Sequence, residues 1–279
     1  MEYPRRPPEP DQPSWMGYAQ PLRPVQDGHN PELHPRDWQG QLAAAARGPL
    51  QWGFQAFFLG FGGFYLASLV VTAVLTRSVS DFDSPNASHS VPLGPVLPLM
   101  FLPNLLLGLV PALFSWFRGN GPRLDFGLVP SWRDLRVGLA CGGISLGLGY
   151  VVNLLLLAIL PQSQTGGSSL DIAFGDQRTV WAALAALFVF VGAPLTEELL
   201  VRGALWGALE HYRIHRYVIL VLTSMIFAFL HQDPDRTLAL FCQGMALGSA
   251  RMITGRIGSS MVAHATNNLI PALVLFLVG

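Results

Sequence analysis

Lysine is absent from this 279-residue sequence, in which all 17 basic residues are arginines, and we expect this bias to reflect a GC-rich bacterial genome. Charge of either sign is scarce: 12% of the residues are charged, whereas 51% are hydrophobic. Soluble globular domains contain about 25% charged residues. The composition therefore excludes an ordinary soluble domain and predicts a polytopic membrane protein.

Cysteine is scarce too, and no run of basic residues is interleaved with aromatic ones. The two cysteines, Cys141 and Cys242, both lie in apolar runs. This placement predicts small buried side chains and excludes a disulfide or cysteine-metal framework. Without a basic, aromatic stretch the sequence gives no reason to expect nucleic acid as a partner.

The first 45 residues lack an apolar period and lack the apolar core of a signal peptide. Seven prolines occur before residue 25, among Gln, Asp and Arg residues. Such a composition cannot bury enough apolar surface to fold, so we predict that residues 1–45 form a disordered cytoplasmic tail. A short amphipathic patch from Trp38 to Arg47 is compatible with the membrane surface and equally with the tail.

Seven apolar segments after the tail are long enough to cross, or nearly cross, a bilayer. They predict an all-α fold, a helical membrane domain over residues 46–279. The second segment contains five prolines, which predicts a kinked helix whose freed carbonyls bond to neighbouring helices. The segments are residues 51–76, 92–117, 136–160, 179–209, 214–231, 237–253 and 259–278.

Arginine-rich and acidic loops alternate between these segments. Arginines gather in the loop 118–136, in the turn 212–217 and in the turn after the sixth segment. The positive-inside rule then predicts a cytoplasmic amino terminus and an outward carboxyl terminus in a multi-pass protein of the cell (plasma) membrane. The acidic loops contain Asp81, Asp83, Asp171, Asp176, Asp233 and Asp235.

Three ionisable residues, Glu197, Glu198 and Arg202, stand inside the fourth apolar segment. A charged side chain at the bilayer centre costs about 2.5 to 3.5 kcal/mol on insertion scales, so such residues pair or line a wet cavity. Glu198 and Arg202 are four residues apart with the acid first and share a helix face, whereas Glu197 is rotated by about 100°. We therefore predict a Glu198–Arg202 ion pair and a freer Glu197 carboxylate.

Two further polar clusters follow in the apolar segments. Phe227 precedes His231 by four residues at the end of the fifth segment, and His264 and Asn268, also four apart, share a face of the last segment. At about 1.5 Å per residue from the expected cytoplasmic helix ends, we expect these side chains and Glu197 to converge near mid-membrane. The convergence requires a short fifth helix and a following turn that dips below the outer membrane surface.

A carboxylate, two imidazoles and an amide suit the activation of water for hydrolysis. Glu197 would accept a proton as general base, and His231 would position the water or share the proton transfer. His264 and Asn268 would donate hydrogen bonds to the oxyanion that develops on a scissile carbonyl. The alternative is a zinc site formed by Glu197, His231 and His264 with one open position. No His-Glu-x-x-His motif occurs, so the sequence permits zinc without implying it.

Three ordered motifs carry a family resemblance: Glu-Glu-x-x-x-Arg, then Phe-x-x-x-His, then His-x-x-x-Asn. Over about residues 179 to 275 the chain resembles the CPBP family, the CAAX-prenyl-protease and bacteriocin-processing intramembrane endopeptidases, also called the Abi family. The resemblance implies a water-activating pair, two oxyanion or orienting groups, and supporting residues. These are, in that order, Glu197 with His231, His264 with Asn268, and Glu198 with Arg202 and Phe227.

One part of the resembling stretch departs from the family pattern. The last segment is entered through residues 256–260, Arg-Ile-Gly-Ser-Ser, where the commoner family sequence is of the Gly-Ser-Leu-Trp type. This difference concerns the rim of the cavity and the shape of the substrate, because the motif residues themselves are intact. Residues 179–279 are thus the expected motif-bearing catalytic core.

The leading hypothesis is an intramembrane endopeptidase that cleaves a membrane-associated peptide or protein with water activated by Glu197 and His231. A second hypothesis is a non-proteolytic bacteriocin-immunity or scaffolding membrane protein that retains the motif residues. A third, a transporter whose buried acids relay protons, is disfavoured because no inverted repeat or pair of broken helices is visible.

Overall fold

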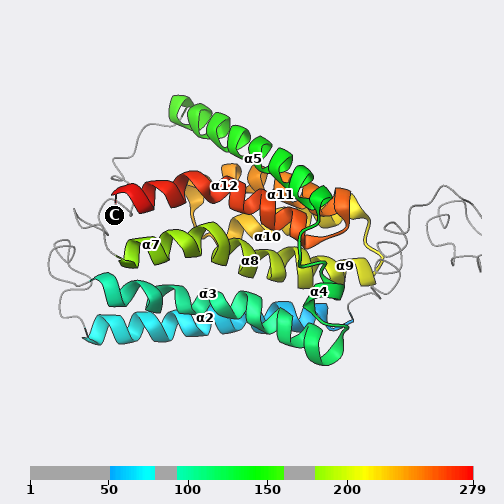
Figure 1. Cartoon of the computed structure of the whole chain (residues 1–279), viewed down its shortest axis with the longest axis horizontal. Coiled ribbons are helices and arrows are strands. Elements are labelled where there is room, and N and C mark those ends of the chain that lie inside the picture. Colours follow the sequence, from blue (N-terminus) through cyan, green and yellow to red (C-terminus); the bar gives the residue numbers. More distant parts are fainter. Residues whose placement is uncertain (1–50, 79–92, 160–179, 279) are drawn as a thin grey trace, which may run out of the picture. The chain divides into compact units, whose positions relative to one another are not determined.

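The computed structural model describes residues 51–78, 93–159 and 180–278, and within these ranges the chain forms helices and turns only. The predicted tail, the patch from Trp38 to Arg47 and the acidic loops of Asp81, Asp83, Asp171 and Asp176 lie outside the described residues. The elements, shown in Figure 1, are α2 (Gly53–Ser78), α3 (Leu93–Arg118), α4 (Pro122–Asp125), α5 (Trp132–Ile159), α7 (Val180–Leu187), η3 (Phe188–Gly192), α8 (Ala193–Glu198), η4 (Leu199–Leu205), α9 (Trp206–His211), α10 (Arg216–Leu230), η5 (Pro234–Arg236), α11 (Thr237–Thr254) and α12 (Ile257–Val278).

Five stretches of the described helices are long and apolar enough to cross a membrane. The predicted segments 214–231 and 237–253 correspond to α10 and α11, which do not meet this criterion, because α10 has only 15 residues and α11 is less apolar. The all-helical structure and its long apolar helices show that this is a multi-pass membrane protein. The five stretches are Gly53–Arg77, Phe101–Arg118, Trp132–Leu156, Val180–His211 and Ile257–Leu277.

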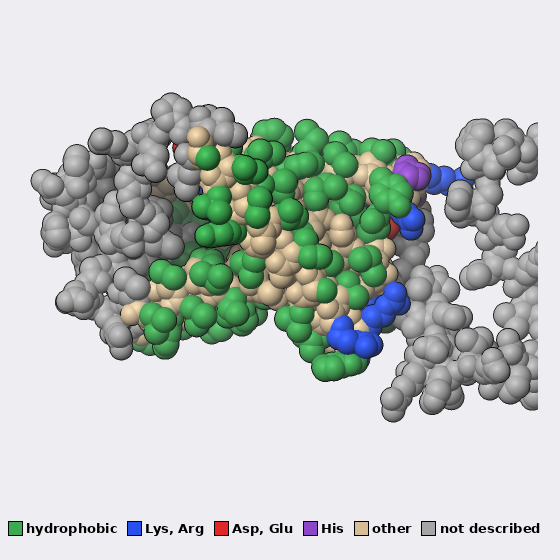
Figure 2. Space-filling model, turned by 90° about the horizontal axis from the view of Figure 1, so that it is seen from above, with side chains coloured by type: hydrophobic (Ala, Val, Ile, Leu, Met, Phe, Trp, Pro, Cys, Tyr) green, Lys and Arg blue, Asp and Glu red, His purple; other side chains and the backbone are tan. Residues whose placement is uncertain are grey.

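The outward faces of the long helices are apolar. Leu66 and Leu69 of α2 are 65% and 67% exposed, and Leu277 of α12 is 58% exposed. Soluble monomers rarely expose contiguous apolar surface on this scale, whereas lipid tails cover it without cost. Figure 2 shows hydrophobic side chains over most of the described surface on one face, with arginine side chains gathered at one end.

At the arginine-rich end, an ion pair and a hydrogen bond between side chains connect the ends of neighbouring helices. Arg256, at the start of α12, bonds to Asp134 of α5 at 2.8 Å, and Arg118 of α3 donates to Gln55 of α2 at 2.7 Å. Asp134 also accepts from the Ser131 N–H at 2.7 Å, while its own N–H donates to the Ser131 hydroxyl at 3.2 Å. This reciprocal cap starts α5 where the sequence has Ser-x-x-Asp.

Helices α7 to α9 form one continuous helical run from Val180 to His211, and two of its stretches, η3 and η4, are wound as π-helix. Such wide turns are rare and occur frequently at functional sites. Here they flank α8, the short stretch that carries Glu197 and Glu198. Pro194, which has no N–H, is the second residue of α8, two positions after the end of η3.

Glycines bring α11 close to α10. A Cβ atom at Gly244 would lie 3.1 Å from the Cα atom of Ser224, and one at Gly248 would lie 2.5 Å from the Leu220 side chain. Their four-residue spacing places both on the same face of α11, so the two helices pack backbone against side chain. The Gly244 carbonyl is thereby brought into the interior.

The prediction that both cysteines are buried is wrong for Cys242. Cys141 is buried, but Cys242 is only partly buried, and both are free thiols. Cys242 lies two residues after Leu240 and two before Gly244, both of which are buried. A two-residue step turns a helix position by about 200°, so Cys242 faces away from the buried side of α11.

Candidate active site

Glu198 and Arg202 form an ion pair in the protein interior. Arg202 Nη1 donates to Glu198 Oε1 at 3.0 Å, and both side chains are fully buried. Arg202 Nη2 donates to the Gly244 carbonyl at 2.9 Å, and the guanidinium lies 4.6 Å from the Phe227 ring centroid. Buried charges are tolerated when they are paired and hydrogen-bonded, so this pair depends on α11 and α10 as well as on its own helix. The ion pair expected from the four-residue spacing is present.

His264 joins the same carboxylate from α12. Its Nδ1 atom lies 3.0 Å from Glu198 Oε1, and its side chain is 4% exposed. An ionised carboxylate only accepts hydrogen bonds, so His264 Nδ1 is the donor. Glu198 Oε2 is buried and has no hydrogen-bond partner among the described residues. The sequence did not predict the contact between Glu198 and His264, because no spacing rule links side chains on two different helices.

Glu197 points to two imidazole rings. Its Oε2 atom lies 4.0 Å from His231 Nε2 and 4.0 Å from His264 Nε2. Both distances exceed the usual limit of about 3.2 Å for a direct N–H···O hydrogen bond. They match the separation of two groups that share a third hydrogen-bonding partner. Glu197 is 17% exposed and His231 is 31% exposed, so this side of the cluster is accessible, unlike Glu198.

The ring of His231 is oriented by its own helix. His231 Nδ1 lies 2.8 Å from the Phe227 carbonyl oxygen. A carbonyl only accepts, so Nδ1 carries the hydrogen and Nε2 is the nitrogen that faces Glu197. The Phe227 ring packs against both histidines, with centroid distances of 4.7 Å to His231 and 5.4 Å to His264. Phe227 thus contacts both imidazoles and the Arg202 guanidinium.

Asn268 is held by the π turn η3. Its Nδ2 atom donates to the Val189 carbonyl at 3.0 Å. This carbonyl is available because the Ala193 N–H donates to the Phe188 carbonyl, and Pro194 has no N–H. Within the described part of the chain, no hydrogen bond joins Asn268 to Glu197, His231 or His264. The Asn268 amide nitrogen carries two hydrogens, and Val189 engages one of them.

Two polar residues that the sequence did not single out support Asn268. Ser145 of α5 donates from its hydroxyl to Asn267 Oδ1 at 2.9 Å, and Asn267 Nδ2 lies 3.4 Å from Asn268 Oδ1. Ser145 is fully buried in the apolar middle of α5. A serine inside an apolar segment is a signal that could have identified Ser145 from the sequence, because a buried hydroxyl needs a hydrogen-bond partner.

Among the described residues, no group of three or more His, Cys, Asp and Glu side chains is arranged to hold a metal ion. In the set that the sequence offered for zinc, the Nε2 atoms of His231 and His264 each lie 4.0 Å from Glu197 Oε2. Zinc at this site stays a prediction.

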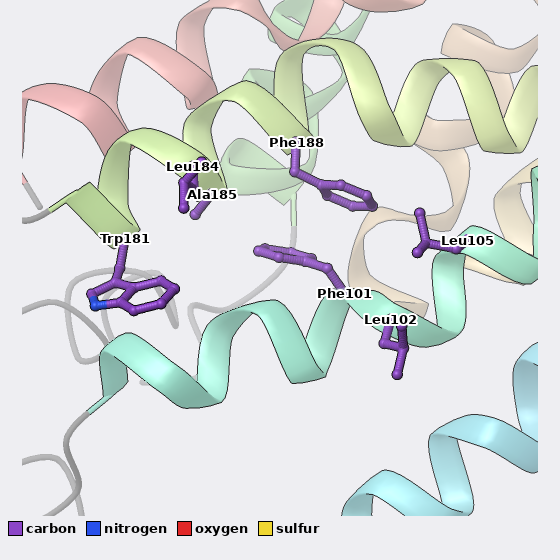
Figure 3. Close-up of a pocket in the computed structure, with 7 residues that line it drawn as sticks. All are labelled: Phe101, Leu102, Leu105, Trp181, Leu184, Ala185 and Phe188. Atoms are coloured by element: carbon purple, nitrogen blue, oxygen red, sulfur yellow. The ribbon is translucent and has the colours of Figure 1, made fainter.

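A separate apolar pocket lies between α3 and α7, as Figure 3 shows. The rings of Phe101 and Phe188 stack across it with a centroid distance of 4.5 Å. The polar cluster around Glu197 does not contribute to its lining, so the pocket is no part of the candidate site. The lining residues are Phe101, Leu102, Leu105, Trp181, Leu184, Ala185 and Phe188.

The polar cluster falls within a family match. Residues 179–270 match the family model described as Rce1-like, type II CAAX prenyl endopeptidase Rce1-like, which confirms the resemblance to the CPBP/CAAX protease family. The matched stretch excludes α2, α3 and α5. No curated protein and no solved structure matches the chain. The motif residues inside the match are Glu197, Glu198, Arg202, Phe227, His231, His264 and Asn268.

Proposed function

From the match of residues 179–270 to a family of CAAX endopeptidases, we propose that this multi-pass membrane protein is an intramembrane endopeptidase. Its substrate in this proposal is a membrane-associated peptide or protein. The observation that carries the proposal is the position of Glu197, whose carboxylate oxygen lies 4.0 Å from the Nε2 atoms of both His231 and His264.

The first step is activation of water between Glu197 and His231. Both facing atoms, Glu197 Oε2 and His231 Nε2, are hydrogen-bond acceptors, and they lie 4.0 Å apart. A water oxygen about 2.8 Å from each would direct its two hydrogen bonds about 90° apart, close to its own bond angle. Glu197 accepts the proton as the water oxygen attacks the scissile carbonyl, and later delivers that proton to the leaving amine.

Stabilisation of the oxyanion is assigned to His264 and Asn268. In this proposal the His264 ring carries protons on both nitrogens, with Nδ1–H held by Glu198 and Nε2–H donating to the oxyanion. Asn268 donates through the amide hydrogen that Val189 does not engage.

The supporting residues hold the reacting ones in place. Arg202 and His264 both donate to Glu198 Oε1, at 3.0 Å each, which links α12 to the run from α7 to α9. Phe227 supplies the carbonyl that orients His231. The structure around Glu198 is thus fixed while Glu197 stays accessible, and a fixed geometry with an accessible base is what hydrolysis requires.

The proposed function is tested with Glu197→Gln in reconstituted vesicles supplied with membrane peptides. Cleavage should be abolished while the thermal unfolding temperature stays near that of the wild type. Glu210→Gln is the matched control, because Glu210 is 52% exposed at the far end of the same helical run. Retained cleavage in Glu197→Gln would refute the mechanism. A cellular phenotype that survives both Glu197→Gln and His231→Gln would favour the binding or immunity role instead.

A proteomic comparison identifies the substrate. Membranes from cells with the wild-type protein and with Glu197→Gln should differ in a small set of peptides, and the uncleaved precursor should accumulate with the variant. Inspection of that precursor shows whether it carries a prenyl group, the feature named in the family description.

A further inference from the structure

Gln232, the residue directly after His231, has an unusual backbone. Its φ angle is +50°, in the left-handed region, and its N–H donates to the Phe229 carbonyl at 3.1 Å as α10 ends. Helices often end on a left-handed residue, but that residue is usually glycine, sometimes asparagine. A glutamine here is strained by its own Cβ atom, so other contacts must hold the conformation.

The Gln232 side chain bonds to α2. Its amide nitrogen donates to the hydroxyl oxygen of Tyr65, a residue 167 positions earlier in the chain. The Tyr65 ring is itself packed edge-on against Phe61 and Phe64, with centroid distances of 4.7 and 5.3 Å. The hydroxyl that receives Gln232 therefore stands on a ring with a fixed position.

Helix α2 passes close to the stretch that carries Glu197. A Cβ atom at Gly60 would lie 2.9 Å from the Leu200 side chain, and one at Gly53 would lie 2.5 Å from the Ala204 carbonyl. The two helices thus run in opposite directions, and one turn beyond Gly60 brings α2 to the level of Glu197. Tyr65 lies at that turn, so its bond to Gln232 joins α2 to the α10 end beside the site.

The residues on each side of His231 are fixed by different helices. On the amino-terminal side, the Phe227 carbonyl holds the ring through Nδ1 at 2.8 Å. On the carboxyl-terminal side, the Gln232–Tyr65 bond holds the left-handed turn. The following residue, Asp233, accepts from the Arg236 N–H at 3.1 Å and so caps η5, whereas the side chain of Gln232 reaches α2.

We propose that Tyr65 and Gln232 are positioning residues for His231: their hydrogen bond keeps Nε2 of His231 facing Glu197. This rests on the proposed function only in its effect on catalysis, because the claim about the ring of His231 concerns structure. Tyr65 lies outside the matched stretch 179–270, so the proposal extends the functional unit to α2.

The first test is a double-mutant cycle with Tyr65→Phe and Gln232→Met. Each change removes one partner of the bond while keeping the size of the side chain. We expect each to lower kcat about tenfold, the upper range for loss of one neutral hydrogen bond, with KM within about twofold of wild type. The double variant should lose no more than either single one, because both act through one bond. Additive losses, or an unchanged kcat, would overturn the proposal.

The matched control is Tyr150→Phe, the same substitution at an exposed tyrosine of α5, which is 68% exposed. It should leave kcat and KM unchanged. A similar loss in this control would show that the effect of Tyr65→Phe is not specific to the bond.

The second test does not need activity. The ring nitrogens of ¹⁵N-labelled histidine are observed by NMR, with the His231 signals assigned by their loss in His231→Gln. Tyr65→Phe should shift or broaden the Nε2 signal of His231, and Tyr150→Phe should not. Unchanged His231 signals would overturn the positioning role even in an active enzyme. A shifted signal in a protein without any peptidase activity would refute the proposed function and leave the positioning role supported.

Discussion

Glu198 Oε1 and His264 Nδ1 lie 3.0 Å apart although 66 positions separate the two residues in the chain. The same oxygen accepts from Arg202, so one buried carboxylate joins an arginine of its own helical run and a histidine of α12. The neighbouring Glu197 lies 4.0 Å from the other ring nitrogen of His264, beyond direct hydrogen-bond distance, and is partly exposed. Two adjacent acids thus differ in environment, one fixed and one accessible, which is the arrangement that a general base beside a structural ion pair requires.

The first prediction concerns the ion pair. Glu198→Met should destabilise the protein by about 3 to 5 kcal/mol, because it leaves the Arg202 guanidinium buried without its charge partner. Thermal or denaturant unfolding in detergent measures this loss. The double variant Glu198→Met with Arg202→Met should recover part of the stability, since both charges are then removed. A double variant as unstable as the sum of the two single ones would contradict the pairing.

The second prediction concerns Asn268. Asn268→Ala should reduce kcat about 100- to 1000-fold, as the loss of one oxyanion donor does in other hydrolases, with little change in KM. Asn153→Ala on the exposed face of α5 is the matched control. Steady-state cleavage of the same peptide by both variants decides the outcome, and an equal, small effect in the two would exclude Asn268 from the chemistry.

The third prediction concerns Pro194. Pro194→Ala supplies a backbone N–H that can bond to the Val189 carbonyl, which accepts from Asn268 in the wild type. The helix should gain stability, because proline is unfavourable inside a helix. Activity should nevertheless fall, by about tenfold if Asn268 loses one hydrogen bond. Measuring the unfolding temperature and kcat of one preparation separates the two effects; a fall in both would point to general damage instead.

The fourth prediction concerns the contact between α10 and α11. Gly244→Ala should destabilise the protein by about 1 to 3 kcal/mol, because the new methyl group would lie 3.1 Å from the Ser224 Cα atom. Gly143→Ala is the control, since a Cβ atom there meets nothing within 4 Å. The control should gain about 0.5 to 1 kcal/mol from the better helix propensity of alanine. Opposite signs of the two changes in unfolding free energy are the expected result.

The features that the sequence predicted correctly depend on local spacing. Apolar length located the helices, and the four-residue interval identified the Glu198–Arg202 pair. The count of seven spans is not confirmed: five stretches of the described residues are long and apolar enough to cross a membrane, and the stretch 214–231 forms a helix of only 15 residues. Length and hydropathy alone do not separate a helix that crosses the membrane from one that ends within it.

The contacts between different helices could not be predicted from the sequence. Nothing in the spacing links His264 to Glu198, Ser145 to Asn267 or Gln232 to Tyr65, because each contact depends on how two helices pack. The π turn before Pro194 was also not predicted. A proline indicates a disturbed helix, but whether the chain bends or widens is decided by the neighbours that take up the freed carbonyl, here Asn268.

In the proposed endopeptidase, the short α10 would set the depth at which a substrate is cut. Its 15 residues span about 22 Å, whereas the hydrocarbon core of a bilayer is about 30 Å thick. If α10 begins at the membrane boundary on the arginine-rich side, His231 stands about 8 Å short of the opposite boundary. A substrate that crosses as a helix covers this distance in about five residues. The peptide bond that reaches Glu197 should therefore lie about five residues inside the membrane. The length of α10 would then determine where along the substrate helix cleavage occurs.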